Sequence, residues 1–252
     1  MSWPIETVLF VYPGKLTYGQ GELILWELEL MGENADHGLF LEVILPAIEE
    51  LGSVLDPQWQ HWNVLWGHFD IQAVYAARGR QWETVVSDGR LDLSYRVTPT
   101  QWAEGLTFDS GSERIFDRLT WLTPFDLTSE SGRRHRRKKI ARHQVPTLQR
   151  ILESLVARMG QLLPGKHHTP DDVWAVLGAE ERASFQAAME QAARIPVHHT
   201  SLKPAPKYWP GRWIGTQTFP SIPHPIIPYL ELASILHIGR QTHFGCGTFV
   251  IG

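Results

Sequence analysis

Hydrophobic periodicity in the second half of the chain changes repeatedly between the strand and helix types. An alternating segment, 114–128, precedes a helical segment, 145–163, in which apolar residues recur every three or four positions. Two further helical patterns follow, then proline-interrupted strands over 197–218, a short helix over 227–237 and a final strand over 248–251. This order predicts a β-α-β-β-α-β unit with an inserted helical pair.

The first half contains a related but less regular pattern. Strands are expected over 6–12 and 22–31, a helix over 39–51, and a strand pair over 69–77 and 82–87. The sequence therefore predicts the α+β class, with two tandem ferredoxin-like (RRM-like) domains. We expect an N-terminal domain over residues 1–112 and a C-terminal domain over 113–252, the second carrying a basic helical insertion and a glycine-rich loop.

Prolines and capping residues predict where these elements begin and end. Pro124 is expected to close the strand 114–128, and Pro146 is expected in the first turn of the long helix. Thr169, followed by Pro-Asp-Asp, is typical of a helix start. Pro46 weakens the helix prediction around it, and Gly52 is a plausible C-terminal cap.

Composition excludes several classes of protein. Hydrophobic residues are 43% of the 252 residues and charged residues are 20%, which is typical of a chain with a packed core. Cys246 is the single cysteine, so one chain forms no disulfide and no cysteine-rich zinc module, which fits a reducing compartment such as the cytoplasm. The N-terminus lacks the features of a signal peptide, and no apolar run reaches the ~18 residues of a membrane span.

Charge is distributed very unevenly along the chain. Residues 1–132 carry 7 Lys and Arg against 20 Asp and Glu, whereas residues 133–252 carry 16 against 7. The net charges are therefore −13 and +9. This asymmetry indicates a polyanion-binding face in the second half, although the surface charges of an ordinary protein can also divide in this way.

A run of seven cations within ten positions begins the basic half. A helix of this composition is surrounded by positive charge and cannot pack into a core. Nucleic-acid phosphates would supply the counter-charge, while the alternative is a solvated, flexible charge run. The cations are Arg133, Arg134, Arg136, Arg137, Lys138, Lys139 and Arg142.

The C-terminal stretch LHIGRQTHFGCGTFVIG is the most distinctive part of the sequence. Gly239, Gly245 and Gly247 lie between a predicted helix and the last strand. Glycine lets backbone N–H groups approach a phosphate closely, and Arg240 and His243 would add positive charge. The pattern is not that of a P-loop, and the alternative is a tight turn before an edge strand.

Histidines are numerous, but few occur in informative places. The pairs His167-His168 and His198-His199 are weak metal candidates, because adjacent side chains diverge on a strand and no cysteine or HExxH partner accompanies them. We therefore expect neither a metal nor another cofactor. His37 lies where a polar loop meets the predicted helix 39–51, and a histidine there can act as a general acid or base, although a lone loop histidine often has no such role.

These motifs together resemble those of CRISPR-associated repeat-RNA-processing endoribonucleases of the RAMP superfamily. The C-terminal stretch resembles the glycine-rich loop of that family. LTWLTPFDL with VPTLQRILESLVARM resembles the opening of its C-terminal domain, and ELILWELELMGENADHGLFLEVILPAIEELG resembles its N-terminal "strand, Gly, helix" segment. The basic run resembles the arginine-rich helical finger of the variant found in type IV CRISPR systems.

The resemblance implies a fold and an activity. It implies two ferredoxin-like domains and metal-independent cleavage of precursor CRISPR RNA, in which a ribose 2′-OH attacks the scissile phosphate and leaves a 2′,3′-cyclic phosphate. By location, His37 matches the family's catalytic histidine, Tyr18 precedes it, and Lys15 or Arg240 would stabilise charge. Partners would be the crRNA hairpin and other CRISPR effector subunits, with no membrane.

Two other interpretations remain open from the sequence. The chain can be a non-catalytic RNA-binding subunit of a CRISPR effector, with the same fold and grooves. It can also be an interaction protein outside CRISPR systems, in which the basic run is a docking tail. Cleavage by a His37→Ala variant and the salt dependence of RNA binding separate the three interpretations, since phosphate contacts give a steep dependence on salt.

Overall fold

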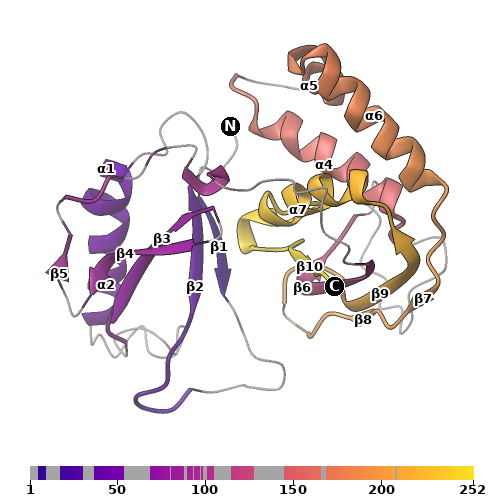
Figure 1. The fold of residues 1–252 in the computed structure, drawn as a ribbon. Helices are drawn as coiled ribbons and strands as arrows, with labels where there is room; N and C mark the ends of the chain where they lie inside the picture. Colours follow the sequence, from indigo (N-terminus) through magenta and orange to yellow (C-terminus); the bar gives the residue numbers. More distant parts are fainter. Residues whose placement is uncertain are drawn as a thin grey trace. The chain divides into compact units, whose positions relative to one another are not determined.

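The computed structural model describes residues 5–9, 18–30, 37–53, 69–79, 81–87, 90–92, 94–96, 98, 101–104, 115–127, 145–165, 169–207 and 209–252. The chain divides into two compact units (Figure 1). The larger unit combines residues 1–31 with residues 108–252, and the smaller unit consists of residues 32–107. One junction lies close to the expected domain boundary at residue 112, while residues 1–31 group with the C-terminal part.

An antiparallel sheet forms the base of the larger unit. Its strands are β6 (Phe116–Phe125), β7 (His199–Thr200), β8 (Lys203–Pro204), β9 (Trp213–Ile222) and β10 (Phe249–Ile251). The hydrogen-bonded order is β10-β6-β9-β7, and β8 also pairs with β9. All of these pairings are antiparallel. The first and last strands of this part of the chain therefore lie side by side, although about 120 residues separate them.

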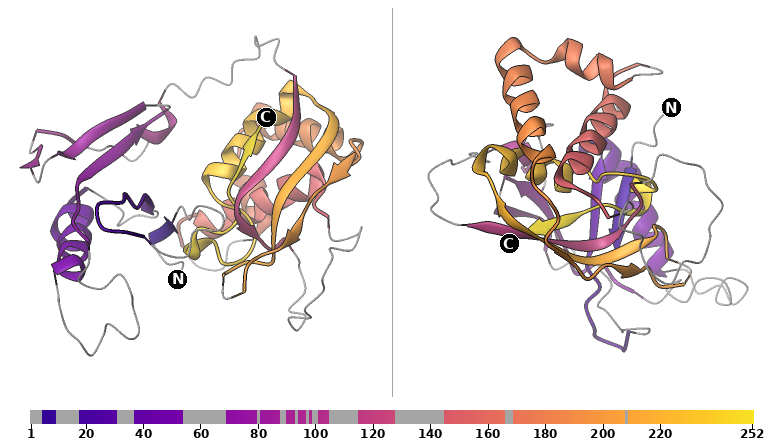
Figure 2. Two further views of the ribbon diagram at one scale, coloured as in Figure 1. Left: turned by 90° about the horizontal axis from the view of Figure 1, so that it is seen from below. Right: turned by 90° about the vertical axis from the view of Figure 1, so that its right-hand side faces the viewer.

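The helices of the larger unit gather on one face of this sheet (Figure 2). They are α4 (Leu148–Leu162), α5 (Pro170–Val176), α6 (Ala179–Ala193) and α7 (Ile227–Ile235), the last preceded by the short 3₁₀ helix η4 (His224–Ile226). The hydrogen bonds that open α5 confirm its predicted start, because Thr169 forms a capping box with Asp172.

The core of the larger unit lies between the sheet and these helices. Strand β6 supplies alternate residues to this core, since successive side chains of a strand point to opposite faces. The predicted stripe of α4 is confirmed, with five fully or almost fully buried members and Met159 packed at its margin. The buried hydrophobic residues that these two elements contribute to the core are Leu119, Trp121, Phe125, Leu148, Ile151, Leu152, Leu155 and Val156.

A two-stranded hairpin from the N-terminus completes the larger unit. Strands β1 (Ile5–Leu9) and β2 (Trp26–Leu30) pair antiparallel over their whole length. Strand β1 lies beside η5 (Thr242–Phe244), a 3₁₀ turn near the C-terminus. The two expected N-terminal strands are therefore present, and β2 begins at Trp26, four residues later than predicted, while residues 10–12 and 31 lie outside the described residues.

The smaller unit packs a helical segment against a three-stranded antiparallel sheet with the order β3-β4-β5. Its small core includes Leu45, Val85 and Val86. The predicted strand pair around Gly79 is confirmed as the hairpin of β3 and β4. The elements of this unit are α1 (His37–Leu39), the π-helical turn η1 (Phe40–Ile44), α2 (Leu45–Ser53), β3 (Ala73–Arg78), β4 (Gln81–Ser87), β5 (Arg90–Leu91) and the 3₁₀ turn η2 (Gln101–Ala103).

A polar network joins β3, β4 and the segment after β5 in the smaller unit. Nε of Arg78 lies 2.9 Å from Glu83, and its Nη1 lies 2.5 Å from Glu104. The Tyr95 hydroxyl donates a further hydrogen bond of 2.7 Å to Glu83. These two donors hold the pKa of the Glu83 carboxyl below its ordinary value, the Arg78 hydrogen bond having the larger effect.

Proline and glycine produce four differences from the predicted element ends. Strand β6 continues through Pro124, which lies at a register irregularity between Trp121 and Phe125, where a missing N–H breaks no regular ladder. Pro146 precedes the N-cap of α4, Thr147, rather than lying in the first turn. Pro46 is the second residue of α2, two positions after the π-helical turn ends at Ile44, and its missing N–H interrupts the regular helical ladder there.

Gly52 is the fourth difference, because it lies inside the last turn of α2 and is not a cap beyond it. A Cβ at this position would be 2.4 Å from the carbonyl oxygen of Phe69. Its role is therefore the close approach of two backbones. The described elements confirm the α+β class with antiparallel sheets, and none of the helices within the described ranges is long and apolar enough to cross a membrane.

Candidate nucleic-acid interface

The glycine-rich segment, residues 237–248, connects α7 to β10 through an unusually folded backbone. Five of its residues have a positive φ angle: His237 (52°), Gly239 (97°), Gln241 (65°), Gly245 (71°) and Gly247 (94°). Two of these, His237 and Gln241, are not glycine, and side chains rarely adopt this conformation. The segment therefore has a defined conformation that the surrounding structure must stabilise.

Two of the glycines are required by close contacts. A Cβ at Gly247 would lie 2.0 Å from the carbonyl oxygen of Ile238, within the segment itself. A Cβ at Gly239 would lie 2.6 Å from the carbonyl oxygen of Asp126, just beyond the end of β6. Both positions thus exclude any side chain on steric grounds in addition to their φ angles.

Backbone hydrogen bonds attach the segment to the end of β6. The amide of Gly247 donates to the Pro124 carbonyl at 3.0 Å, and the amide of Arg240 donates to the Asp126 carbonyl at 3.0 Å. The amide of Gly245 donates to Thr242 at 2.6 Å. These N–H groups are thus used inside the protein, so the glycines serve the local turn, and the role of Gly239, Gly245 and Gly247 in RNA binding stays a prediction.

A buried arginine and a half-buried arginine of α4 donate hydrogen bonds to the backbone next to this segment. Arg158 of α4 is 5% exposed, and its Nε donates at 2.9 Å to the Leu236 carbonyl at the end of α7. Arg150, also of α4, donates through Nη2 at 3.1 Å to the carbonyl of Leu127. Neither residue was predicted as a functional residue, although an arginine within the apolar stripe of a helix, as at position 158, is a signal of such a role.

A histidine at the start of the segment contacts the N-terminal hairpin. His237 is 2% exposed, and its Nε2 lies 3.6 Å from Oε1 of Glu29 on β2. Glu27, two residues earlier on the same strand face, has its pKa raised by burial, an effect that the nearby His237 partly opposes. None of these three residues was singled out from the sequence, because nothing local in the chain indicates that β2 meets this loop.

The opposite side of the segment presents side chains to solvent. Arg240, His243 and Phe244 are exposed, the last at 59%, whereas Thr242 and Cys246 are buried. The rings of His243 and Phe244 contact one another with a centroid distance of 4.1 Å. The predicted residues Arg240 and His243 are therefore both exposed on this segment, and Phe244, which the sequence did not point to, is exposed beside His243.

The other predicted site residues are placed only in part. His37 is the first residue of α1 in the smaller unit, and its side chain lies outside the described part. Tyr18 is half-buried and precedes β2 in the larger unit. The basic run 133–142 and Lys15 also lie outside the described residues. The catalytic assignments of His37, Tyr18 and Arg240 therefore stay predictions.

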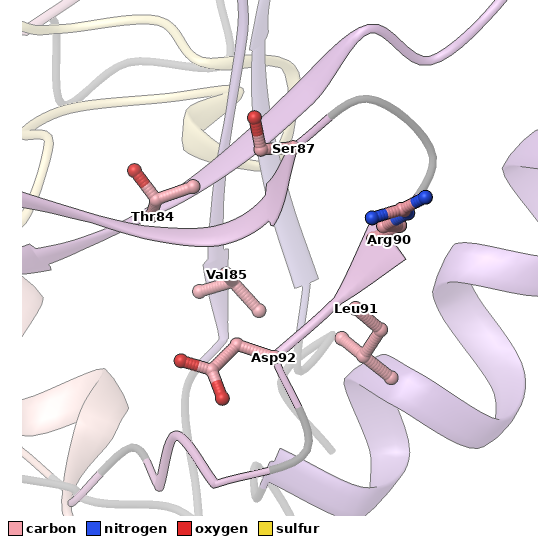
Figure 3. Close-up of a pocket in the computed structure, with 6 residues that line it drawn as sticks. All are labelled: Thr84, Val85, Ser87, Arg90, Leu91 and Asp92. Carbon is pink, nitrogen blue, oxygen red and sulfur yellow. The ribbon is translucent and has the colours of Figure 1, made fainter.

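An open pocket is present in the smaller unit, at the end of β4 and beside β5 (Figure 3). It contains none of the residues predicted to bind RNA or act in catalysis. Within the described ranges, no group of three or more His, Cys, Asp or Glu side chains could hold a metal ion. The lining residues of the pocket are Thr84, Val85, Ser87, Arg90, Leu91 and Asp92.

Comparison with solved structures finds chains of low identity. In a partial Cas6-RT-Cas1–Cas2 complex, the matched chain is 17% identical with a TM-score of 0.36, and the match covers 56% of this chain and 23% of that one. For a Cas6 product complex the identity is 14%, the TM-score is 0.44, and the coverages are 99% and 82%. The chain thus spans less than a quarter of the length of the first of these proteins.

Comparison at the level of sequence families is more informative. The family model described as CRISPR-associated endoribonuclease Cas6 matches residues 119–249. No curated protein sequence matches the chain. The matched range runs from β6 through α4–α7 into β10, and it includes the whole glycine-rich segment with its exposed Arg240, His243 and Phe244. Because this range is just over half of the chain, the chain belongs to the CRISPR-associated endoribonuclease Cas6 family.

Proposed function

We propose that this protein is a metal-independent endoribonuclease that cleaves precursor CRISPR RNA within its repeats and remains bound to the 3′ hairpin of the product. The observation that carries the proposal is the glycine-rich segment, which lies inside the range matched by the family. The backbone amides of Arg240, Phe244, Gly245 and Gly247 are bonded to the protein, and the exposed side chains of the segment are a cation, a histidine and an aromatic ring.

The proposed reaction is an internal transesterification of RNA. The 2′-oxygen of the ribose before the cut attacks the phosphorus, and the bond from phosphorus to the 5′-oxygen of the next nucleotide breaks. A base takes the 2′-hydroxyl proton, and an acid gives a proton to the leaving 5′-oxygen. The products are a 2′,3′-cyclic phosphate and a 5′-hydroxyl, and a cation stabilises the charge on the pentacovalent phosphorus.

The protein offers one candidate for each of these tasks. His37 would exchange the proton, because histidine titrates near neutral pH. Tyr18 would orient or protonate an RNA oxygen. Arg240 would bind the phosphate, and its exposed position on the glycine-rich segment supports this role.

Net charge supports the larger unit as the principal RNA-binding body. Residues 1–31 and 108–252 carry 19 basic and 16 acidic residues, while residues 32–107 carry 4 and 11. The seven cations of 133–142 belong to the larger group and would add phosphate contacts along the hairpin. We further propose that other subunits of a CRISPR effector bind the protein when it retains the RNA.

The chain order in the C-terminal part supports a ferredoxin-like domain there. Strand, helices, two short strands, long strand, helix and strand follow one another, and the sheet order is β10-β6-β9-β7. A second such domain over residues 1–112 completes the proposed tandem arrangement. The smaller unit contributes a helical segment and a hairpin to it.

The first experiment is cleavage of labelled repeat RNA from the same genome, in EDTA, with and without a 2′-deoxy substitution at the cut site. Cutting that resists EDTA and is blocked by the deoxy substitution is the expected result. Cutting that requires a divalent metal ion, or that tolerates the deoxy substitution, would contradict the mechanism. Tight hairpin binding with no cutting would identify a non-catalytic RNA-binding subunit instead.

Variants then test the residues one by one. His37→Ala is expected to lower the cleavage rate by about 10²-fold or more while leaving RNA affinity nearly unchanged. Tyr18→Phe tests the hydroxyl alone. His198→Ala is the matched control, because His198 is exposed and has no proposed role. Normal cleavage by the His37→Ala variant would remove His37 from the proposal without affecting the family assignment.

A further inference from the structure

Phe244 is a large aromatic side chain that the protein leaves exposed at the tip of the glycine-rich segment. Its exposed fraction is 59%, and its ring meets the ring of His243 at 4.1 Å and an angle of 45°. An exposed phenylalanine contributes little to the core, and on this ordered turn, beside the ring of His243, it offers an apolar aromatic face to a ligand.

The turn that carries Phe244 is held in place on both sides. Gln241 and Gly245 flank η5, and both have left-handed φ angles. The amide of Phe244 donates to the Gln241 carbonyl at 3.0 Å, and the side chain of Gln241 accepts a hydrogen bond of 2.7 Å from the amide of Gly211. The ring is therefore presented on a backbone that is already ordered, which lowers the entropy cost of binding.

The charges around Phe244 indicate the chemistry of this ligand. Arg240 is exposed four residues earlier, and residues 232–252 themselves contain no Asp or Glu. The acidic residues of other elements that meet the segment interact with its buried residues His237 and Cys246: Glu27 and Glu29 with the first, and Asp126 with the second. A ligand that combines an aromatic face with negative charge suits both features. A nucleotide of single-stranded RNA has this combination, because its base stacks on aromatic rings and its phosphate pairs with arginine.

We propose that Phe244, with His243 beside it, is a stacking platform for one unpaired nucleobase of the bound RNA, next to a phosphate held by Arg240. The inference rests on the proposed function and extends it to a residue that positions the RNA. The unpaired base would lie beside the hairpin, since bases inside a duplex offer no free face.

The smaller unit contains two exposed aromatic residues that serve as a comparison for Phe244. Tyr75 and Trp82 are 55% and 62% exposed, and strand pairing places them on the same face of the β3–β4 hairpin. They lie in a unit with 4 basic and 11 acidic residues. Exposed aromatic rings in this acidic setting are expected to contribute nothing to RNA binding, so Trp82→Ala is the control.

The test uses the full chain and repeat RNAs that carry 2-aminopurine at one flanking nucleotide at a time. Wild-type protein is expected to change the fluorescence at one position. Phe244→Ala should abolish this change and weaken binding about tenfold, Phe244→Leu should behave like Phe244→Ala, and Phe244→Trp should retain both properties. Trp82→Ala should match the wild type.

Three outcomes would contradict the proposed stacking role of Phe244. The first is wild-type RNA affinity and fluorescence in Phe244→Ala, and the second is the same result in Phe244→Leu. The third is a loss of RNA affinity in Trp82→Ala equal to that in Phe244→Ala. The Arg240→Ala variant distinguishes a failure of the stacking proposal from a failure of the proposed function. If Arg240→Ala weakens RNA binding while Phe244→Ala does not, the proposed RNA-binding function is retained and the proposed stacking role of Phe244 is wrong. If the wild-type protein fails to bind repeat RNA, the proposed function fails as well.

Discussion

The side chain of His237 reaches that of Glu29 across about 200 residues of sequence, with 3.6 Å between Nε2 and Oε1. This contact joins the N-terminal hairpin to the first residue of the glycine-rich segment. His237 is 2% exposed and has a φ angle of 52°. The position of β2 and the backbone of the loop are therefore linked through one buried side chain.

Substitution of His237 separates its backbone role from its side-chain role. Both His237→Gly and His237→Ala lose the contact with Glu29 and should be less stable than the wild type. Glycine adopts a left-handed φ without strain, so His237→Gly should be about 1 kcal/mol more stable than His237→Ala. Urea denaturation measures this difference, and an alanine variant as stable as the glycine variant would contradict it.

Substitution of Gly247 tests the packing of the loop. The Cβ of Gly247→Ala would lie 2.0 Å from the Ile238 carbonyl, so we expect a loss of about 3 kcal/mol in the free energy of unfolding. Gly252→Ala is the matched control, because a Cβ there meets nothing within 4 Å. Thermal unfolding measures both, and equal melting temperatures for the two variants would show that the loop is not packed as described.

Glu27 predicts a pH dependence of stability. Burial raises its pKa above the ordinary value of 4.5, so the folded state holds the proton to a higher pH than the unfolded state does. This group therefore lowers stability as pH rises from about 4.5 through its folded pKa. Glu27→Gln removes the effect, and its stability relative to the wild type should increase between pH 4 and pH 7 in urea titrations. A difference that is constant or decreases with pH would refute this assignment.

Cys246 is expected to be chemically inert in the native protein. Burial, with a smaller contribution from Asp126, raises the pKa of its thiol to about 12. At pH 8 the thiolate is then about one part in ten thousand, and the thiol is enclosed. A chromogenic disulfide reagent should label the protein in denaturant and leave the native protein unlabelled for hours. Rapid stoichiometric labelling of the native protein would show that the segment opens.

Arg240 predicts a change in the salt dependence of RNA binding. Arg240→Ala would remove the phosphate contact proposed for this residue, so the slope of log affinity against log salt should fall by about one. The control is Arg194→Ala, which removes an exposed arginine at the end of α6. Filter binding over a range of salt concentrations measures the slopes. An unchanged slope for Arg240→Ala would place the phosphate contacts elsewhere.

Elements with strong local signals were predicted well from the sequence. The stripe of α4 lies on the buried face, the capping box opens α5, and the β3–β4 hairpin turns at Gly79. In each case the determining residues are within a few positions of one another. The effect of a proline on a strand is harder to predict from the sequence. Pro124 would end its strand only if a neighbouring strand needed the N–H that proline lacks, and this depends on the strand pairing.

In the candidate site, too, some features were predictable from the sequence and others were not. The sequence by itself determined that residues 239–247 form a glycine-rich turn and that Arg240 and His243 belong to it, because spacing and residue type carry that information. Only the tertiary structure decided that Glu29 meets His237, that Arg158 binds the end of α7, and that Phe244 faces solvent. These contacts join segments far apart in the chain, and such approaches depend on the packing of the whole unit, which no local pattern encodes.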